Sequence, residues 1–217
     1  MANETKTLQV PQPPLLPIAP VEYGQRYQDQ YSNALRLYFN QLSGIFSTEL
    51  GPLGGRFLNN PYGSFYDTTD QAAASTTTAY AITYNTTDLS NGVTIVSNSR
   101  ITFAYTGLYN IQFSVQLSNS DNAPQDVDIW FRKNGTDIAN SNSRFGLAAR
   151  KSVGDPFHIV GALNFFVSVA ANDYIQLMWR TSNTGVQIEY YAAGTTPTRP
   201  AIPSVILTTT FVSSVIT

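Results

Sequence analysis

The sequence of 217 residues predicts a mainly β protein, an antiparallel sandwich that follows an extended arm and one helix. Three observations predict this fold class. Apolar and polar residues alternate without interruption over 109–117, which is the pattern of a strand with one buried face. Short apolar runs of the same kind recur at intervals of about 8–20 residues. Turn signals separate them, and Asn91-Gly92 and Asn134-Gly135 are the strongest.

The composition excludes several classes of protein. Charged residues make up 12% of the chain, about half of the usual ~25%, while 42% of residues are hydrophobic. That balance argues against a disordered chain. The net charge is −2 and no basic run occurs, so we expect no nucleic-acid partner. No apolar run approaches the ~20 residues of a membrane span, so we expect no membrane insertion.

Cysteine is absent from the sequence, which excludes disulfides and thiolate metal sites. Met1 is followed by polar residues and not by the apolar core of an export signal. We therefore expect the protein to be made in the cytosol.

Residues 1–21 form the predicted arm, which holds five prolines between Pro11 and Pro20. Proline fixes φ and removes a backbone donor, so this segment is expected to be extended or polyproline II. A disordered spacer is one interpretation. The other is a docking strap, because a stiff apolar peptide loses little entropy in another protein's groove. The candidate docking residues are Pro11, Pro13, Pro14, Leu15, Leu16 and Ile18.

Residues 22–47 are predicted to form a helix. Its apolar residues follow 4-3-4-3 spacing, which places them on one stripe. That stripe packs either on the chain's own β-domain or on identical chains in a short coiled coil, and we expect self-association as a trimer. Just over two heptads are marginal alone, so a second contact is needed. The candidate trimer contacts on the helix are Tyr31, Leu35, Tyr38, Leu42 and Ile45.

Glycines from Gly44 onward are expected to end the helix, and the Gly- and Pro-rich segment 48–64 is predicted to be a linker. Residues 65–217 then form the β-domain. A long surface loop is expected at 140–156. The strands are expected at 80–84, 93–96, 101–105, 109–117, 127–131, 136–139, 159–169, 174–180, 186–191 and 205–211.

The segment 159–169 is apolar on both of its faces. Leu163 and Phe165 belong to one face, and Val160 and Phe166 belong to the other. A strand with two apolar faces is expected to be covered twice, once by the core and once by a neighbour. Phe166 is therefore a further candidate trimer contact. The whole pattern predicts an antiparallel sandwich or jelly roll.

Several short motifs occur in the order and spacing of one β family. They are Gly107-x-Tyr109 at the start of a strand, 128–135, 172–177 and the closing Phe211. Over about 65–212 the chain resembles the C1q/TNF-like jelly-roll domains. This resemblance implies a jelly roll, packed as a homotrimer around a threefold axis and often preceded by an N-terminal stalk.

A second resemblance concerns 30–42, which follows the proline-rich start, and 200–208 near the end. These segments are similar to uncharacterised structural proteins of marine tailed bacteriophages. The resemblance implies a virion location and a structural role. Neither resemblance distinguishes the head of the particle from its neck or tail.

Candidate catalytic and metal sites are weak in this sequence. His158 is the single histidine, and no Gly-x-Ser-x-Gly motif surrounds a serine. Asp121, Asp126 and Asp128 offer oxygen ligands for Ca²⁺, but solvated carboxylates on an outer face are the simpler interpretation. We expect no enzymatic activity, no cofactor and no bound metal.

Three aromatic residues, Trp130, Tyr190 and Tyr191, are candidate glycan contacts. Trp130 alternates with the core residues of its strand, so it is expected to be either exposed or buried in a subunit contact. The expected function is that of a homotrimeric phage virion protein, either a capsid decoration (cement) protein or a head- or tail-fibre type. Its arm would bind a major capsid, portal, adaptor or tail protein. The alternative is a lectin-like fibre knob that binds host-surface glycan.

Overall fold

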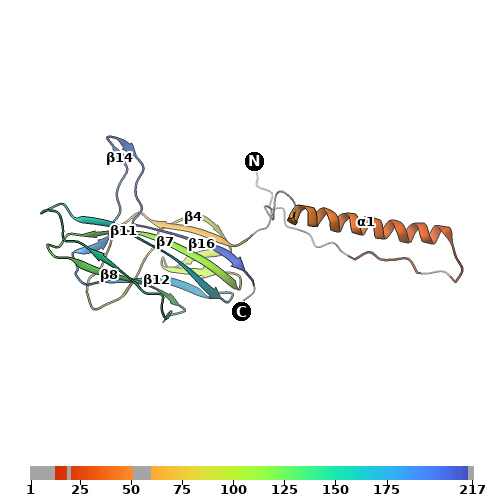
Figure 1. The fold of residues 1–217 in the computed structure, drawn as a ribbon, viewed down its shortest axis with the longest axis horizontal. Coiled ribbons are helices and arrows are strands. Elements are labelled where there is room, and N and C mark those ends of the chain that lie inside the picture. The colour runs from red at the N-terminus through yellow and green to blue at the C-terminus, as the bar shows by residue number, and fades with distance from the viewer. Residues whose placement is uncertain (1–12, 19–20, 51–59, 215–217) are drawn as a thin grey trace. The chain divides into compact units, whose positions relative to one another are not determined.

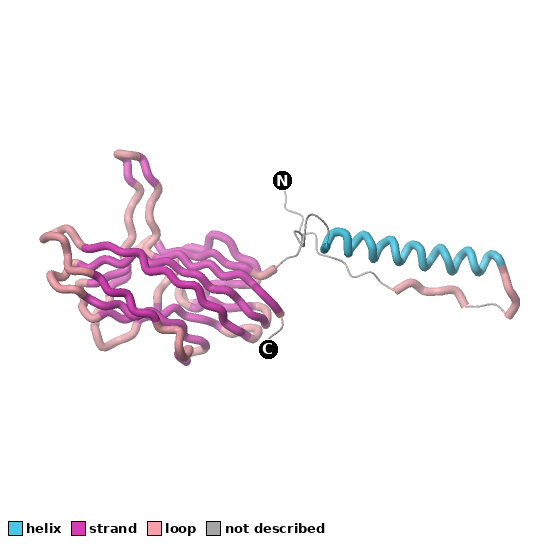
Figure 2. The backbone as a smooth tube through the Cα atoms, viewed as in Figure 1, coloured by secondary structure: helices cyan, strands magenta, loops and turns pink. Residues whose placement is uncertain are grey.

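The computed structural model describes residues 13–18, 21–50 and 60–214, and the side chains of 47–50 are not described. Pro11 and most of the predicted linker lie outside the described residues. The chain divides into two units, residues 1–59 and 60–217. The first holds one helix and the second holds the strands, as Figures 1 and 2 show.

Helix α1 (Gln25–Leu50) is the regular element of the first unit. It begins three residues later and ends three residues later than the predicted 22–47, and Gly44 does not interrupt it. A single glycine inside a helix costs only about 1 kcal/mol relative to alanine, which is too little to stop a helix of 26 residues. Residues 13–18 form neither helix nor strand.

The second unit contains two antiparallel sheets. The strands of sheet A are β1 (Tyr62–Asp67), β2 (Gln71–Ala72), β4 (Thr86–Asn91), β7 (Gly107–Asn119), β11 (Phe157–Val169), β13 (Val186–Ile188) and β16 (Val205–Ser213). Strand β11 pairs with one edge of β7, and β16, β1 and β4 follow in this order from the other edge. Strand β13 pairs with that same edge of β7 beyond the end of β16, and β2 pairs with β13.

The strands of sheet B are β3 (Tyr80–Ala81), β5 (Val93–Val96), β6 (Arg100–Phe103), β8 (Gln125–Lys133), β9 (Thr136–Asp137), β10 (Ser143–Leu147) and β12 (Tyr174–Thr181). Their order is β10-β8-β12-β6-β5, with β9 paired to β8 and β3 paired to β12. The mainly β, antiparallel prediction is therefore confirmed.

Strand β7 is the centre of sheet A. It pairs along its full length with β11 on one side, from Gly107 with Val169 to Asn119 with Phe157. On the other side it pairs with β16 and β13. The odd-numbered apolar residues from Tyr109 to Leu117 are all buried. The uninterrupted alternation in the sequence thus corresponds to the one face of β7 that is buried in the core.

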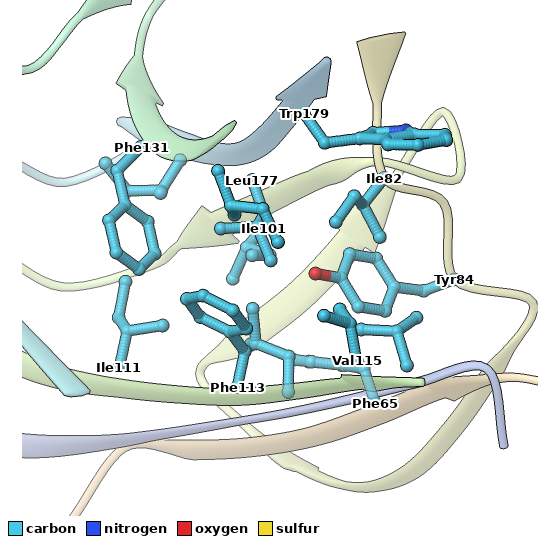
Figure 3. Packing of buried hydrophobic residues seen from close by; sticks show 14 of the residues in the cluster. Phe65, Ile82, Tyr84, Ile101, Ile111, Phe113, Val115, Phe131, Leu177 and Trp179 are labelled. Atoms are coloured by element: carbon cyan, nitrogen blue, oxygen red, sulfur yellow. The ribbon is translucent and has the colours of Figure 1, made fainter. Parts of the chain in front are cut away.

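The two sheets pack face to face around one core. Figure 3 shows Ile111, Phe113 and Val115 of β7 facing Phe131 and Leu177 of sheet B. The ring of Phe131 stacks on Phe165 of β11, with centroids 5.0 Å apart, and meets the edge of Phe113 at 5.9 Å. Contacts of this kind across the two layers make the unit a β-sandwich.

The prediction of a surface loop at 140–156 was partly wrong, because this segment contains β10. That strand pairs with β8 from Ser143 with Ile129 to Leu147 with Gln125. Leu147 is buried and Phe145 packs against the core. The strand was missed because only two apolar residues alternate in it.

Strands β14 (Gly194–Thr195) and β15 (Thr198–Arg199) form a small hairpin that stands away from the sandwich in Figure 1. Its base is closed by Tyr191 and Ile202, whose backbone groups exchange hydrogen bonds of 3.0 and 2.8 Å. The Arg199 side chain donates to the Ala192 carbonyl at 3.3 Å. This hairpin is thus held at its base and presents its tip to solvent.

Candidate functional site

On the outer face of sheet A, the three strands β11, β7 and β16 carry no carboxylate, lysine or arginine, whereas β4 carries the exposed Asp88. Because β11, β7 and β16 pair in register, Phe166, Asn110 and Thr210 form one row across this face. The even-numbered residues of these strands point away from the core. The outer face of sheet A comprises Val160, Ala162, Asn164, Phe166, Asn110, Gln112, Ser114, Gln116, Ile206, Thr208, Thr210 and Val212.

Large apolar side chains are exposed on this face. Phe166 is 55% exposed and Val160 is 53% exposed, as expected from the second apolar face of this strand. A hollow of about 170 Å³ lies between β7 and β16, next to Ile206 and Thr208. Apolar exposure without charge is typical of the centre of protein–protein interfaces. The outer face of sheet A is thus the strongest candidate interaction surface.

At one end of this face, His158, Tyr191 and Glu189 form a small cluster. The Tyr191 hydroxyl donates to Glu189 Oε2 at 2.7 Å and lies 2.8 Å from His158 Nδ1. Because the hydroxyl has one proton, His158 supplies the proton of the second hydrogen bond. Burial, followed by the Glu189 carboxylate, raises the pKa of Tyr191. Within the described residues, the histidine therefore bonds to tyrosine and not to a serine hydroxyl.

Trp130 is covered by its own chain. Only 9% of it is exposed, and its Nε1 donates to Asp137 Oδ1 at 2.8 Å. Arg132 Nε donates to the same oxygen at 2.6 Å. The two alternatives offered by the sequence, exposure or burial by another subunit, were therefore both wrong for this side chain. The turn Asn134-Gly135 folds β9 back onto β8, and this brings Asp137 to the indole.

The three candidate glycan contacts do not lie together. Trp130 belongs to β8 of sheet B, whereas Tyr190 and Tyr191 follow β13 of sheet A. Tyr190 is anchored by its backbone N–H, which donates to Asp70 Oδ1 at 2.7 Å. Tyr191 is engaged in the cluster with His158 and Glu189. These residues consequently form no common platform for a sugar.

The three aspartates considered for Ca²⁺ do not converge either. Asp121 accepts hydrogen bonds from the side-chain amides of Gln125 and Asn183, and Asp128 is paired with arginines. Over residues 13–18, 21–50 and 60–214, no group of three or more histidines and acidic residues is placed to hold a metal ion.

Asp128 is the buried charge of sheet B, with 4% of its surface exposed. Arg144 Nε donates to Oδ1 at 2.8 Å, and Arg180 Nε donates to Oδ2 at 2.8 Å. The hydrogen bond from Arg144 is the main cause of the lowered pKa of Asp128, and Arg180 adds to it. The expectation of a solvated carboxylate was wrong here, because two arginine side chains cover it.

The apolar stripe of α1 is half-buried along its length, at the positions of Tyr31, Leu35, Tyr38, Leu42 and Ile45. Phe39 and Phe46 beside the stripe are more than half exposed. Tyr27 stacks on Tyr31 with ring centroids 6.1 Å apart. The helix therefore carries a broad aromatic and aliphatic face that the described part of the first unit leaves accessible.

Of the candidate docking residues, Leu15 and Ile18 are almost fully exposed, and Leu16 is 44% exposed. Pro13 is exposed and Pro14 is half-buried. Among the described residues, no helix is both long and apolar enough to cross a membrane.

Comparison with known proteins adds no assignment. No family model matches this chain, and no curated protein matches it.

Proposed function

We propose that this protein is a bacteriophage virion structural protein, a homotrimeric capsid decoration (cement) or head- or tail-fibre-type protein attached by its N-terminal arm. The observation that carries the proposal is the outer face of β11, β7 and β16, which has no carboxylate, lysine or arginine and exposes Phe166 and Val160. Such a face is suited to a second copy of the chain. Its work is mechanical and involves no turnover.

The size of this face explains why a second contact is needed. Strands lie about 4.8 Å apart and rise about 3.3 Å per residue, so three strands of about nine residues cover roughly 400 Å². A standard interface covers about 800 Å² on each partner. The stripe of α1 from Tyr31 to Ile45 supplies a second apolar surface, which brings the total closer to the area of a standard interface.

The strand pairing supports a jelly roll of the C1q/TNF-like type. When a long hairpin is rolled up, its first strand pairs with its last, its second with the next to last, and so on inward. The pairs β1·β16, β6·β12, β7·β11 and β8·β10 follow this order. Members of that family usually form compact trimers, which agrees with a self-associating sheet face.

The arm is assigned to docking on another virion protein. Leu15 and Ile18 are almost completely exposed on a segment rich in proline, whose φ angles are fixed before binding. An apolar peptide of this kind gains area on a partner at a small entropic cost.

Light scattering on the full chain tests the trimer. The expected mass is three times the 23.8 kDa of one chain, and the mass of a single chain would contradict the proposal. Deletion of residues 2–20 then tests the arm. We expect the shortened protein to remain trimeric and to be lost from phage particles, as measured by its occupancy in purified virions. Unchanged occupancy would refute docking through the arm and leave the trimer untouched.

A further inference from the structure

A hollow of about 260 Å³ lies on the outer face of sheet B, over Trp130. Its other walls are Asp137 of β9, Arg180 of β12, and Ile138 and Asn142 from the segment between β9 and β10. Pockets for drug-sized ligands measure about 300–1,000 Å³. This hollow therefore has room for one small ring and not for a larger ligand.

The floor of the hollow is apolar and fixed in place. The indole of Trp130 is held by the bond from its Nε1 to Asp137 Oδ1, and Met178, which pairs with Trp130 across the strands, is buried. Ile138 continues the apolar surface. Only 9% of Trp130 is exposed, so the apolar contact that it offers to a ligand in this hollow is small and Ile138 adds to it.

Unused polar atoms surround this floor. Asp137 Oδ1 accepts the bonds from Trp130 and Arg132, which leaves Oδ2 as a free acceptor. Arg180 places Nε and Nη2 on Asp128, which leaves Nη1 as a donor. The Asn142 amide is exposed and has no hydrogen-bond partner among the described residues. The residues that carry these donors and this acceptor line the same small hollow.

The charges of the hollow select against an ionic ligand. Asp137 is paired with Arg132, and Arg180 shares the single carboxylate of Asp128 with Arg144. A carboxylate would approach Asp137, and a cation would approach Arg180, so either would meet a like charge. A neutral ligand that can both donate and accept hydrogen bonds avoids this cost.

We infer that this hollow binds one ring of a neutral saccharide. Its hydroxyl groups donate to Asp137 Oδ2 and accept from Arg180 and Asn142, while its apolar face lies on Trp130. The site differs from the set of Trp130, Tyr190 and Tyr191 expected from the sequence, and it does not rest on the virion role or on the trimer.

Saturation-transfer NMR on the full chain tests this inference with four probes, the methyl glycosides of glucose, galactose, mannose and N-acetylglucosamine. We expect at least one to bind with a dissociation constant in the millimolar range, as is usual for a few exposed hydrogen bonds. Asn142→Ala removes one donor from an exposed position and is expected to weaken that binding about tenfold. Asp137→Asn removes the free carboxylate oxygen and is expected to weaken it similarly.

Asn122→Ala is the matched control, because Asn122 is also an exposed amide but does not line the hollow. It should bind the glycoside as the unmodified chain does. Asn142→Trp fills the hollow with an indole and should abolish binding. The inference is overturned if none of the four glycosides receives saturation. It is also overturned if binding survives Asn142→Ala, Asp137→Asn and Asn142→Trp, with circular dichroism showing intact folding.

Discussion

Arg180 directs both Nε and Nη2 to one carboxylate oxygen of Asp128, at 2.8 and 2.6 Å. Arg144 occupies the other oxygen from the neighbouring strand. The carboxylate is thereby buried on the solvent side of sheet B, under side chains that are themselves about half exposed. This arrangement links β10, β8 and β12 across their outer face.

Removing both arginines should destabilise the sandwich. Arg144→Ala with Arg180→Ala leaves the carboxylate of Asp128 without a cation. Loss of one partner from a buried ion pair lowers the free energy of unfolding by ~3–5 kcal/mol. Truncation of the arginines also opens this site to water, which reduces the penalty. We therefore expect urea unfolding to show a loss of about 2 kcal/mol. Lys151→Ala breaks the exposed pair with Asp155 and serves as control, with an expected cost below about 0.5 kcal/mol. If both variants lost the same free energy of unfolding, burial of the Asp128 carboxylate would not be the cause of the loss.

The same carboxylate should make stability depend on pH. The pKa of Asp128 is lowered in the folded state from its ordinary value of 3.8, first by the hydrogen bond from Arg144. Its contribution is therefore fully present above that value and is lost as the pH falls through the folded pKa. The difference in unfolding free energy between the unmodified chain and Asp128→Asn should shrink between about pH 5 and pH 2. A difference in unfolding free energy that did not change with pH would contradict a stabilising role of the ionised Asp128 carboxylate.

Two buried tyrosines should respond in opposite ways to loss of their hydroxyl. The Tyr84 hydroxyl is buried in the core, without a hydrogen-bond partner among the described residues, and burial raises its pKa. Tyr109 donates to the Tyr105 carbonyl at 3.0 Å. Tyr84→Phe should therefore raise thermal stability by about 1 kcal/mol, and Tyr109→Phe should lower it by about as much. A loss for both would mean that Tyr84 has a partner after all.

A charge on the outer face of sheet A should break the self-association. Phe166→Glu places a carboxylate at the centre of the proposed contact, where it would be buried without a partner. The side chain is exposed in the single chain, so folding should be preserved and only the mass by light scattering should fall. Val153→Glu, in the exposed segment between β10 and β11, is the control and should leave the mass unchanged.

The helix offers a matched pair of leucines. Leu35 lies on the apolar stripe, whereas Leu37 is 53% exposed on the opposite side of the helix. The substitutions Leu35→Asn and Leu37→Asn change helix propensity equally, so they differ only in the face that they alter. In sedimentation experiments, Leu35→Asn should dissociate into single chains at protein concentrations at which the unmodified chain and Leu37→Asn remain associated. If the two variants dissociated at the same protein concentration, the apolar stripe of α1 would not take part in the contact between chains.

Local patterns predicted those parts of the fold that depend on neighbours in the chain. The alternation from Tyr109 to Leu117 gave the strand and its buried face. The two-sided apolar pattern of 159–169 placed Phe166 on the face away from the core, where its side chain is 55% exposed, and its cover by a neighbouring chain stays a prediction. The pairing of Asp67 with Val205 had no such signal, because the register of distant strands is set by the packing of the whole sandwich.

The hollow on sheet B was missed for a related reason. Asp128 and Trp130 alternate with core residues, and this pattern places them on the outer face of the strand, either in solvent or, for Trp130, in a subunit contact. The arginines and Asp137 that cover them come from three other strands. One clue was present in the sequence: the Asn134-Gly135 turn fixes Arg132 opposite Asp137, which places that carboxylate beside the outer face of β8.

Strand β16 lies between β7 and β1, although it is the last strand of the sandwich in chain order. Ser204 and Asp67, which it brings together, are separated by 137 positions. During synthesis, sheet A therefore has an open slot at its centre until β16 has left the ribosome. The growing chain exposes two unpaired strand edges in that interval, and such edges favour pairing with other chains. The yield of folded protein should therefore depend on the rate of translation and on chaperones.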